Sequence, residues 1–108
     1  MRLKSKFYVQ ALIRRAEVQG AQAYVARAGA EEAGAIFLKI NRLDGTCMVL
    51  SPALIGEGER AWTRPLGESV DEAKTSEYFA RQTRFDPDIW IVEIEDRQGR
   101  SFVDEKVV

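Results

Sequence analysis

The densest group of side chains that could do chemistry is a set of carboxylates near the end of the chain. Asp86 and Asp88 are followed within eight residues by Glu93, Glu95 and Asp96. Carboxylate oxygens are the ligands that hard divalent cations prefer, and two carboxyl groups can act together as a general acid and base. Carboxylates on a strand can equally form its solvated face or pair with arginines. We favour this structural role and keep a cation site or a carboxylate enzyme as an alternative.

Composition excludes most other catalytic chemistry. The chain has no histidine, which removes Ser-His-Asp and Cys-His catalysis and every zinc site that needs an imidazole. It has one cysteine, Cys47, so a cluster of thiolate ligands is excluded as well. A thiol nucleophile needs a nearby base, and we therefore interpret Cys47 as a small buried residue. We expect a protein that is not an enzyme and that carries no cofactor.

A second candidate surface combines arginine with tryptophan. Arg60, Trp62 and Arg64 alternate along the chain and would share one face of a short extended segment. Arginine beside an exposed indole can bind a protein surface, a nucleic-acid base or a phosphate. In the alternative interpretation, Trp62 is packed in the core and the arginine stems lie over it.

The charges are distributed unevenly along a chain whose net charge is −1. Residues 1–42 carry eight basic and three acidic side chains, whereas residues 43–108 carry eight basic and fourteen acidic ones. Arg14 and Arg15 could therefore belong to a weak nucleic-acid surface. Alternatively, basic and acidic surfaces face each other within one fold or between two copies, and the two arginines complement a helix dipole. We favour the second interpretation.

Apolar periodicity predicts the elements that position these residues. One face of a helix over residues 6–19 is formed by side chains at i, i+3, i+4 and i+7, namely Val9, Leu12, Ile13 and Ala16. Strands are predicted over residues 21–27, 35–41 and 46–51. A second helix, up to residue 84, begins with a capping box in which Ser69 caps and Glu72 reaches back to the amide of Ser69.

The clearest strand pattern begins at Trp90. Trp90, Val92 and Ile94 alternate with Ile91, Glu93 and Glu95, so the first three should face the core. The following residues, Asp96 to Gly99, have the composition of a tight turn. We predict that a return strand through residues 102–103 completes a hairpin.

These elements predict a single α+β domain over residues 1–108. We expect a mainly antiparallel sheet of four to five strands, in the order α-β-β-β-(β)-α-β-β, with both helices on one face. Residues 52–68 are expected to be loop-rich, and residues 1–4 and 105–108 to be frayed. The single cysteine and the lack of an apolar run of about 20 residues favour a cytoplasmic protein without a membrane span.

Several segments together resemble a known family. They are RLKS at 2–5, ALIRR at 11–15, NRLDG at 41–45, and RFDPDIW at 84–90 followed by VEIEDR at 92–97. This set is similar to the small bacterial family catalogued as domain of unknown function 1491, from the first residues to about residue 102. The resemblance implies a free-standing domain in a bacterial cytoplasm, and it brings no activity, substrate or cofactor with it.

Our first functional hypothesis is a non-enzymatic protein-interaction module that binds an unknown protein or a second copy of itself. Such a module would bind through a sheet edge or through the region of Trp62. A homodimer is one assembly that this hypothesis allows. Weak nucleic-acid binding through the basic first helix is the alternative. An enzyme or a divalent-cation site between Asp86 and Asp96 comes third.

Overall fold

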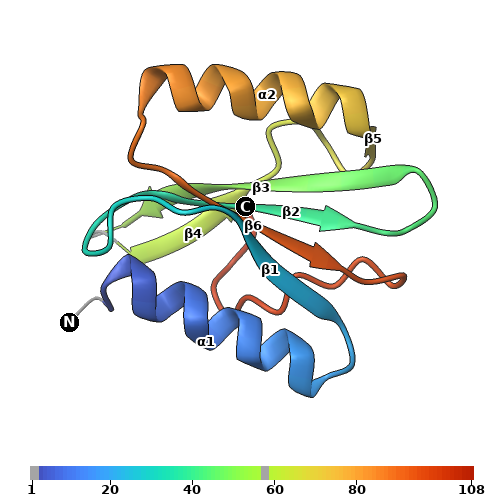
Figure 1. Ribbon diagram of the computed structural model, residues 1–108, viewed down its shortest axis with the longest axis horizontal. Helices are drawn as coiled ribbons and strands as arrows, with labels where there is room; N and C mark the ends of the chain where they lie inside the picture. Colours follow the sequence, from blue (N-terminus) through green and yellow to red (C-terminus); the bar gives the residue numbers. More distant parts are fainter. Residues whose placement is uncertain (1–2, 57–58) are drawn as a thin grey trace.

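The computed structural model describes residues 3–56 and 59–108 (Figure 1). Within these ranges the chain forms two helices and six strands. In order they are α1 (Ser5–Val18), β1 (Gln22–Arg27), β2 (Ile36–Asn41), β3 (Thr46–Ile55), β4 (Glu59–Thr63), β5 (Val70–Asp71), α2 (Glu72–Phe85) and β6 (Trp90–Glu95). The pairings are antiparallel except for one parallel pair. The predicted class, a single α+β domain with a mainly antiparallel sheet, is confirmed.

The last strand, β6, lies inside the sheet. The strand order is β1-β6-β2-β3-β4, and the short β5 also pairs with β3. β6 is antiparallel to β1 and parallel to β2, so that Trp90 lies opposite Ile36. The predicted turn does form, because the amide of Gly99 donates to the carbonyl of Asp96 at 2.9 Å. The predicted hairpin is wrong, since both edges of β6 are already paired and residues 102–103 form no strand.

The two helices cover opposite faces of the sheet (Figure 1). Leu12 of α1 belongs to one buried cluster, which also contains Leu38 and Ile94. Phe79 of α2 belongs to a second cluster, on the other face. Our expectation that both helices share one face is therefore wrong. A sequence signal for two covered faces was present, because β2 reads as an almost continuous apolar run and such runs are typical of strands buried on both sides.

The segment expected to be loop-rich contains more strand than predicted. β3 continues through Pro52 to Ile55 and pairs there with β4, while residues 57–58 lie outside the described part. The pairing of β3 with β2 ends at Leu50, opposite Leu38. Proline has no amide hydrogen and is tolerated where one side of a strand is unpaired. Beyond Leu50, β3 therefore separates from β2 while it stays bound to β4.

The C-terminal residues are held by hydrogen bonds, although we expected residues 105–108 to fray. The amide of Trp62 donates to the carbonyl of Lys106 at 2.9 Å, and the amide of Val108 donates to the carbonyl of Trp62 at 2.7 Å. This segment thus lies along the outer edge of β4. At the other terminus, residues 1–2 of the expected frayed segment lie outside the described part.

Trp90 should contribute strongly to stability. It faces the core cluster under α1 as predicted, is 6% exposed, and its indole nitrogen donates to the carbonyl of Ala30 at 2.7 Å. Trp90→Ala is expected to lower the free energy of unfolding by about 3–5 kcal/mol in urea denaturation. Phe85→Ala is the matched control, because Phe85 is 84% exposed, and it should change stability by less than about 0.5 kcal/mol. Equal midpoints for the two variants would contradict the assigned packing.

Candidate functional site

The carboxylates between residues 86 and 96 do not converge. Asp86 and Asp88 lie in the turn after α2, where the amide of Asp88 donates to Asp86 Oδ1 at 2.9 Å. Glu93 follows Asp88 by five residues, which corresponds to about 16 Å along an extended chain. Asp96 binds Arg100 through both carboxylate oxygens, at 2.9 and 3.0 Å. In the described ranges, no three histidine, cysteine or acidic side chains gather where they could hold a metal ion.

Glu93 is not on a solvated face, contrary to our structural interpretation of this group. It is 8% exposed, because α2 covers that side of the sheet. Its Oε1 lies 3.3 Å from the ammonium nitrogen of Lys39, and its Oε2 accepts from the side-chain amide of Asn41 at 3.2 Å. A buried carboxylate needs such partners, since removing it from water is costly. Glu95, the next residue on that face, is only partly buried.

Glu72 joins the same group of charges from the start of α2. The predicted capping box does not form, because Asp71 caps the helix and accepts from the amide of Lys74 at 2.9 Å. Glu72 is thereby free to accept a hydrogen bond from the ammonium of Lys39 and another from the thiol of Cys47, whose sulfur is 3.3 Å away. We call Lys39, Cys47, Glu72 and Glu93 the Lys39 cluster.

Two members of the Lys39 cluster, Lys39 and Cys47, have raised pKa values. Burial lowers the pKa of Lys39, but the hydrogen bonds and charges of Glu72 and Glu93 outweigh burial and raise this pKa overall. Burial, together with the neighbouring carboxylate of Glu72, raises the pKa of Cys47 to about 11. The lysine therefore stays charged and the cysteine stays a thiol at neutral pH. Cys47 is 1% exposed, which confirms its interpretation as a buried residue.

Trp62 belongs to the core. It is completely buried, and its indole nitrogen donates to Glu105 Oε1 at 3.0 Å, the oxygen that also accepts from the hydroxyl of Tyr8 at 2.7 Å. The core interpretation of Trp62 is therefore confirmed, and its use as an exposed surface residue is wrong. Arg60 lies on the same side of β4, with its guanidinium 4.4 Å from the ring centre of Tyr8. Arg64 follows the strand, is exposed, and pairs with Glu68 at 3.9 Å.

Arg14 and Arg15 point to different surroundings. Arg15 donates to the carbonyl of Phe102 and lies 3.5 Å from a carboxylate oxygen of Asp104, so it holds the C-terminal segment against α1. Arg14 is exposed, about 100° around the helix from Arg15. The structure thus separates the two arginines that the charge pattern placed on one surface.

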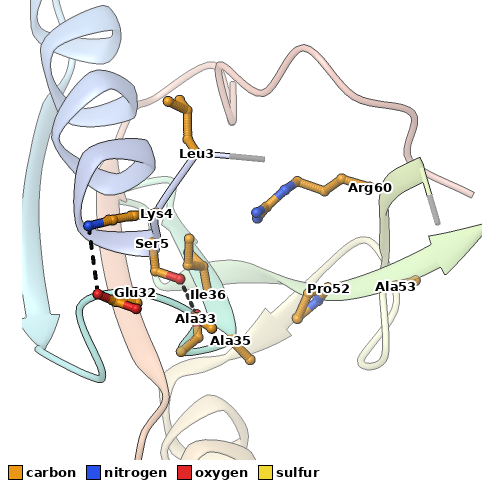
Figure 2. A pocket seen from close by; sticks show the side chains of 11 residues that line it. Leu3, Lys4, Ser5, Glu32, Ala33, Ala35, Ile36, Pro52, Ala53 and Arg60 are labelled. Atoms are coloured by element: carbon orange, nitrogen blue, oxygen red, sulfur yellow. Dashed lines mark hydrogen bonds and ion pairs between the residues drawn. The ribbon is translucent and has the colours of Figure 1, made fainter. Parts of the chain in front are cut away.

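A pocket of about 620 Å³ lies at the start of α1 (Figure 2). It opens where β3 separates from β2, and residues 32–36 form its opposite wall. Arg60 extends from β4 across this pocket. Of the candidate site residues, Arg60 alone is among those that line it: Leu3, Lys4, Ser5, Glu32, Ala33, Gly34, Ala35, Ile36, Pro52, Ala53 and Arg60. Sequence reasoning missed the pocket because four separate segments, residues 3–5, 32–36, 52–53 and 60, form it and none carries a motif.

The outer side of α1 carries a second unpredicted feature. Phe7 is 51% exposed and Val18 is 77% exposed, although both are large apolar residues. Ala11 and Arg14 are exposed between them. These four residues are spaced i, i+4, i+7 and i+11 and form one line along the helix. We call them the outer stripe of α1.

The raised pKa of Cys47 should make stability depend on alkaline pH. In the unfolded chain a thiol loses its proton near pH 8.5, whereas in the fold it does so near pH 11. The contribution of Cys47 is therefore complete below about pH 8.5 and is lost as the pH rises toward 11. Thermal unfolding should show a steeper loss of stability from pH 8.5 to 10.5 in the wild type than in Cys47→Ala. Parallel curves for the two proteins would contradict a buried, protonated thiol.

Comparison with known proteins identifies relatives for nearly the whole chain. A family profile described as "Protein of unknown function (DUF1491)" matches residues 3–104. A crystal structure of a DUF1491 family protein from Caulobacter crescentus CB15 is 48% identical, with a TM-score of 0.91, over 99% of this chain and all of that one. An NMR structure of a DUF1491 family protein from the same organism is 48% identical, with a TM-score of 0.88, over 100% of this chain and 98% of that one.

A more distant relative has the same fold. The solution structure of protein Atu0922 from A. tumefaciens is 35% identical, with a TM-score of 0.84, over 97% of this chain and 95% of that one. No curated protein matches the chain. Among the described helices, none has the length and apolar character needed to cross a membrane. The chain belongs to the DUF1491 family, whose function is unknown.

Proposed function

We propose that this protein is a non-enzymatic interaction module that associates with a second copy of itself through the outer stripe of α1. The observation that carries the proposal is that α1 exposes two large apolar side chains, Phe7 and Val18, on the side opposite its buried face. Tyr8, Val9, Leu12 and Ala16 are buried against the sheet, while Phe7 and Val18 face away from it. A surface helix normally has a polar outer face, so an exposed second apolar line indicates a contact surface.

The spacing of the outer stripe suits a second helix. Side chains at i, i+4, i+7 and i+11 follow the alternating three- and four-residue steps of a helix-packing seam. In an antiparallel pair related by a two-fold axis between Ala11 and Arg14, Phe7 of one copy lies toward Val18 of the other. The small Ala11 then faces Arg14 of the other copy and leaves room for its stem. The same surface is used on both sides, as two-fold symmetry requires.

Charges beside the stripe are complementary in this arrangement. Lys6, which also pairs with Glu31 of its own chain at 3.2 Å, lies near the start of one flank of α1, and Glu17 lies near the end of that flank. Antiparallel pairing places each Lys6 close to Glu17 of the other copy, whereas parallel pairing would put this flank of the two copies on opposite sides of the seam, where the two charges could not meet. Exposed ion pairs add little affinity but help select orientation. The flank therefore favours the antiparallel arrangement.

The expected affinity is modest. A helix of 14 residues is about 21 Å long, and one helix face on each side buries less than the roughly 1,200 Å² at which stable interfaces begin. Dissociation constants in the micromolar range or weaker are expected for such a contact. Association would therefore depend on local concentration.

The sheet edges are less suited to self-association than α1. In the described part of the chain β1 pairs with β6 alone, which leaves its other edge open, but its register shifts between Val25 and Arg27. Such bulges interrupt the regular ladder that a second strand would need. The opposite edge, at β4, is occupied by Lys106 and Val108. These features support α1 over either edge.

Weak nucleic-acid binding through the first helix has less support. Arg15 is engaged by Phe102 and Asp104, which leaves Arg14 as the cation on the outer stripe. A basic patch needs several phosphate contacts to bind at physiological salt. We therefore retain nucleic acid as an outcome that the following experiments can reveal.

The first test places a charge in the stripe. Phe7→Glu should abolish concentration-dependent dimerisation in sedimentation equilibrium, since a carboxylate would be buried against Val18 of the other copy. Phe85→Glu is the control, because Phe85 is even more exposed and lies at the end of α2. If both variants dimerise like the wild type, or if the wild type stays monomeric at millimolar concentration, self-association through α1 is wrong.

The second test exchanges charges on the flank. Lys6→Glu and Glu17→Lys should each weaken dimerisation by a few fold at low salt, and the double variant should recover it. Losses that add in the double variant would contradict the antiparallel arrangement. Gel-shift titration with RNA over a salt series can be run on the same proteins. Binding that depended on Arg14 and fell steeply with salt would favour the nucleic-acid function instead.

A further inference from the structure

We propose that the pocket at the start of α1 binds a small amphipathic monocarboxylate, with Arg60 holding the carboxylate and the pocket holding the apolar body. The pocket is separate from the outer stripe of α1, so this inference does not rest on self-association.

The pocket is held open by the backbone. The ladder between β2 and β3 ends at Leu50, and Pro52 has no amide hydrogen with which to extend it. The opposite wall is fixed by Ser5, whose hydroxyl donates to the carbonyl of Gly34 at 2.6 Å and whose amide donates to the carbonyl of Glu32 at 3.0 Å. Gly34 also packs closely, since a Cβ there would lie 2.4 Å from the carbonyl oxygen of Asp88. A preformed cavity of this kind lowers the cost of binding.

The lining suits an apolar body of moderate size. A volume of about 620 Å³ falls within the range of small-molecule sites. Small or apolar side chains supply most of the wall, namely Leu3, Ala33, Ala35, Ile36, Pro52 and Ala53. The alanines leave the space that longer side chains would fill. The hydroxyl of Ser5 is used within the wall, which leaves few neutral polar groups for a polar ligand.

Arg60 supplies the positive charge that an acidic ligand in the pocket would contact. Its guanidinium is held 4.4 Å above the ring of Tyr8, and Figure 2 shows it extending into the pocket. In the described ranges Arg60 forms no ion pair, whereas Lys4 at the opposite side pairs with Glu32 at 3.6 Å. The nearby carboxylate of Glu105 already accepts from Tyr8 and Trp62.

A monocarboxylate matches this charge better than a dianion. A guanidinium presents two parallel N–H donors that fit a carboxylate. Glu105 lies close enough to Arg60 for their charges to interact, so the guanidinium can balance at most one additional negative charge, and the carboxylate of Glu32 in the opposite wall would repel a second. The ligand class is therefore an acid with one charged head and an aliphatic or small aromatic body.

The test uses octanoate as the probe and amide NMR spectra of the isotope-labelled protein. Octanoate is expected to shift the resonances of residues around the pocket, with octanamide, its neutral counterpart, binding about tenfold more weakly or worse. Arg60→Gln should reduce octanoate affinity by about tenfold or more. Arg64→Gln is the matched control, since Arg64 lies just beyond the same strand and does not line the pocket.

A second variant keeps Arg60 and tests the cavity itself. Ala53→Leu should fill the pocket and block octanoate while leaving the contact between Arg60 and Tyr8 in place. Equal binding of octanoate and octanamide, or unchanged binding in both Arg60→Gln and Ala53→Leu, would overturn the proposal. So would shifts centred on Phe7 and Val18, or no shifts at millimolar octanoate. Phe7→Glu should still bind octanoate, which keeps a failure of self-association distinct from a failure of this site.

Discussion

The position of β6 inside the sheet is the constraint on which the rest of the structure depends. This strand hydrogen-bonds to β1 on one edge and β2 on the other, and α1 and α2 cover its two faces. Because both edges of β6 are occupied, the chain cannot form a return strand beside it after the turn at residues 96–99. It leaves the sheet there instead. The C-terminal residues instead run between α1 and β4, where Glu105 accepts hydrogen bonds from Tyr8 and Trp62. One central strand thus determines the course of the C-terminal segment.

Covering both faces changes the chemistry of the charges on β2 and β6. Lys39 and Glu93 would be ordinary surface residues in a sheet with one open face. Under α2 they are each less than 10% exposed and must neutralise one another, with Glu72 completing the group from the helix. Buried ion pairs of this kind contribute more to register than to net stability. The Lys39 cluster accordingly ties α2 to the sheet, since Glu72 at the start of the helix pairs with Lys39 of β2.

The functional proposals come from surfaces that the core does not use. The inner face of α1 packs against the sheet, and among the described residues Phe7 and Val18 belong to neither core cluster. In the same way, the divergence of β3 from β2 leaves a cavity with an apolar lining, and the guanidinium of Arg60, which stacks on Tyr8, reaches into it. Because these features lie on different sides of the start of α1, they can be tested independently.

The sequence by itself determined the family, the fold class and the ranges of most elements. It also determined that Trp90, Val92 and Ile94 share a core face, because strand alternation is a local property. Tertiary structure decided the placement of β6 between β1 and β2, the burial of Glu93 and Trp62, and the separation of Arg14 from Arg15. It also decided where the pocket lies. These outcomes depend on contacts between segments far apart in the chain, such as Trp62 with Glu105, and no local periodicity encodes which distant partner a side chain will meet.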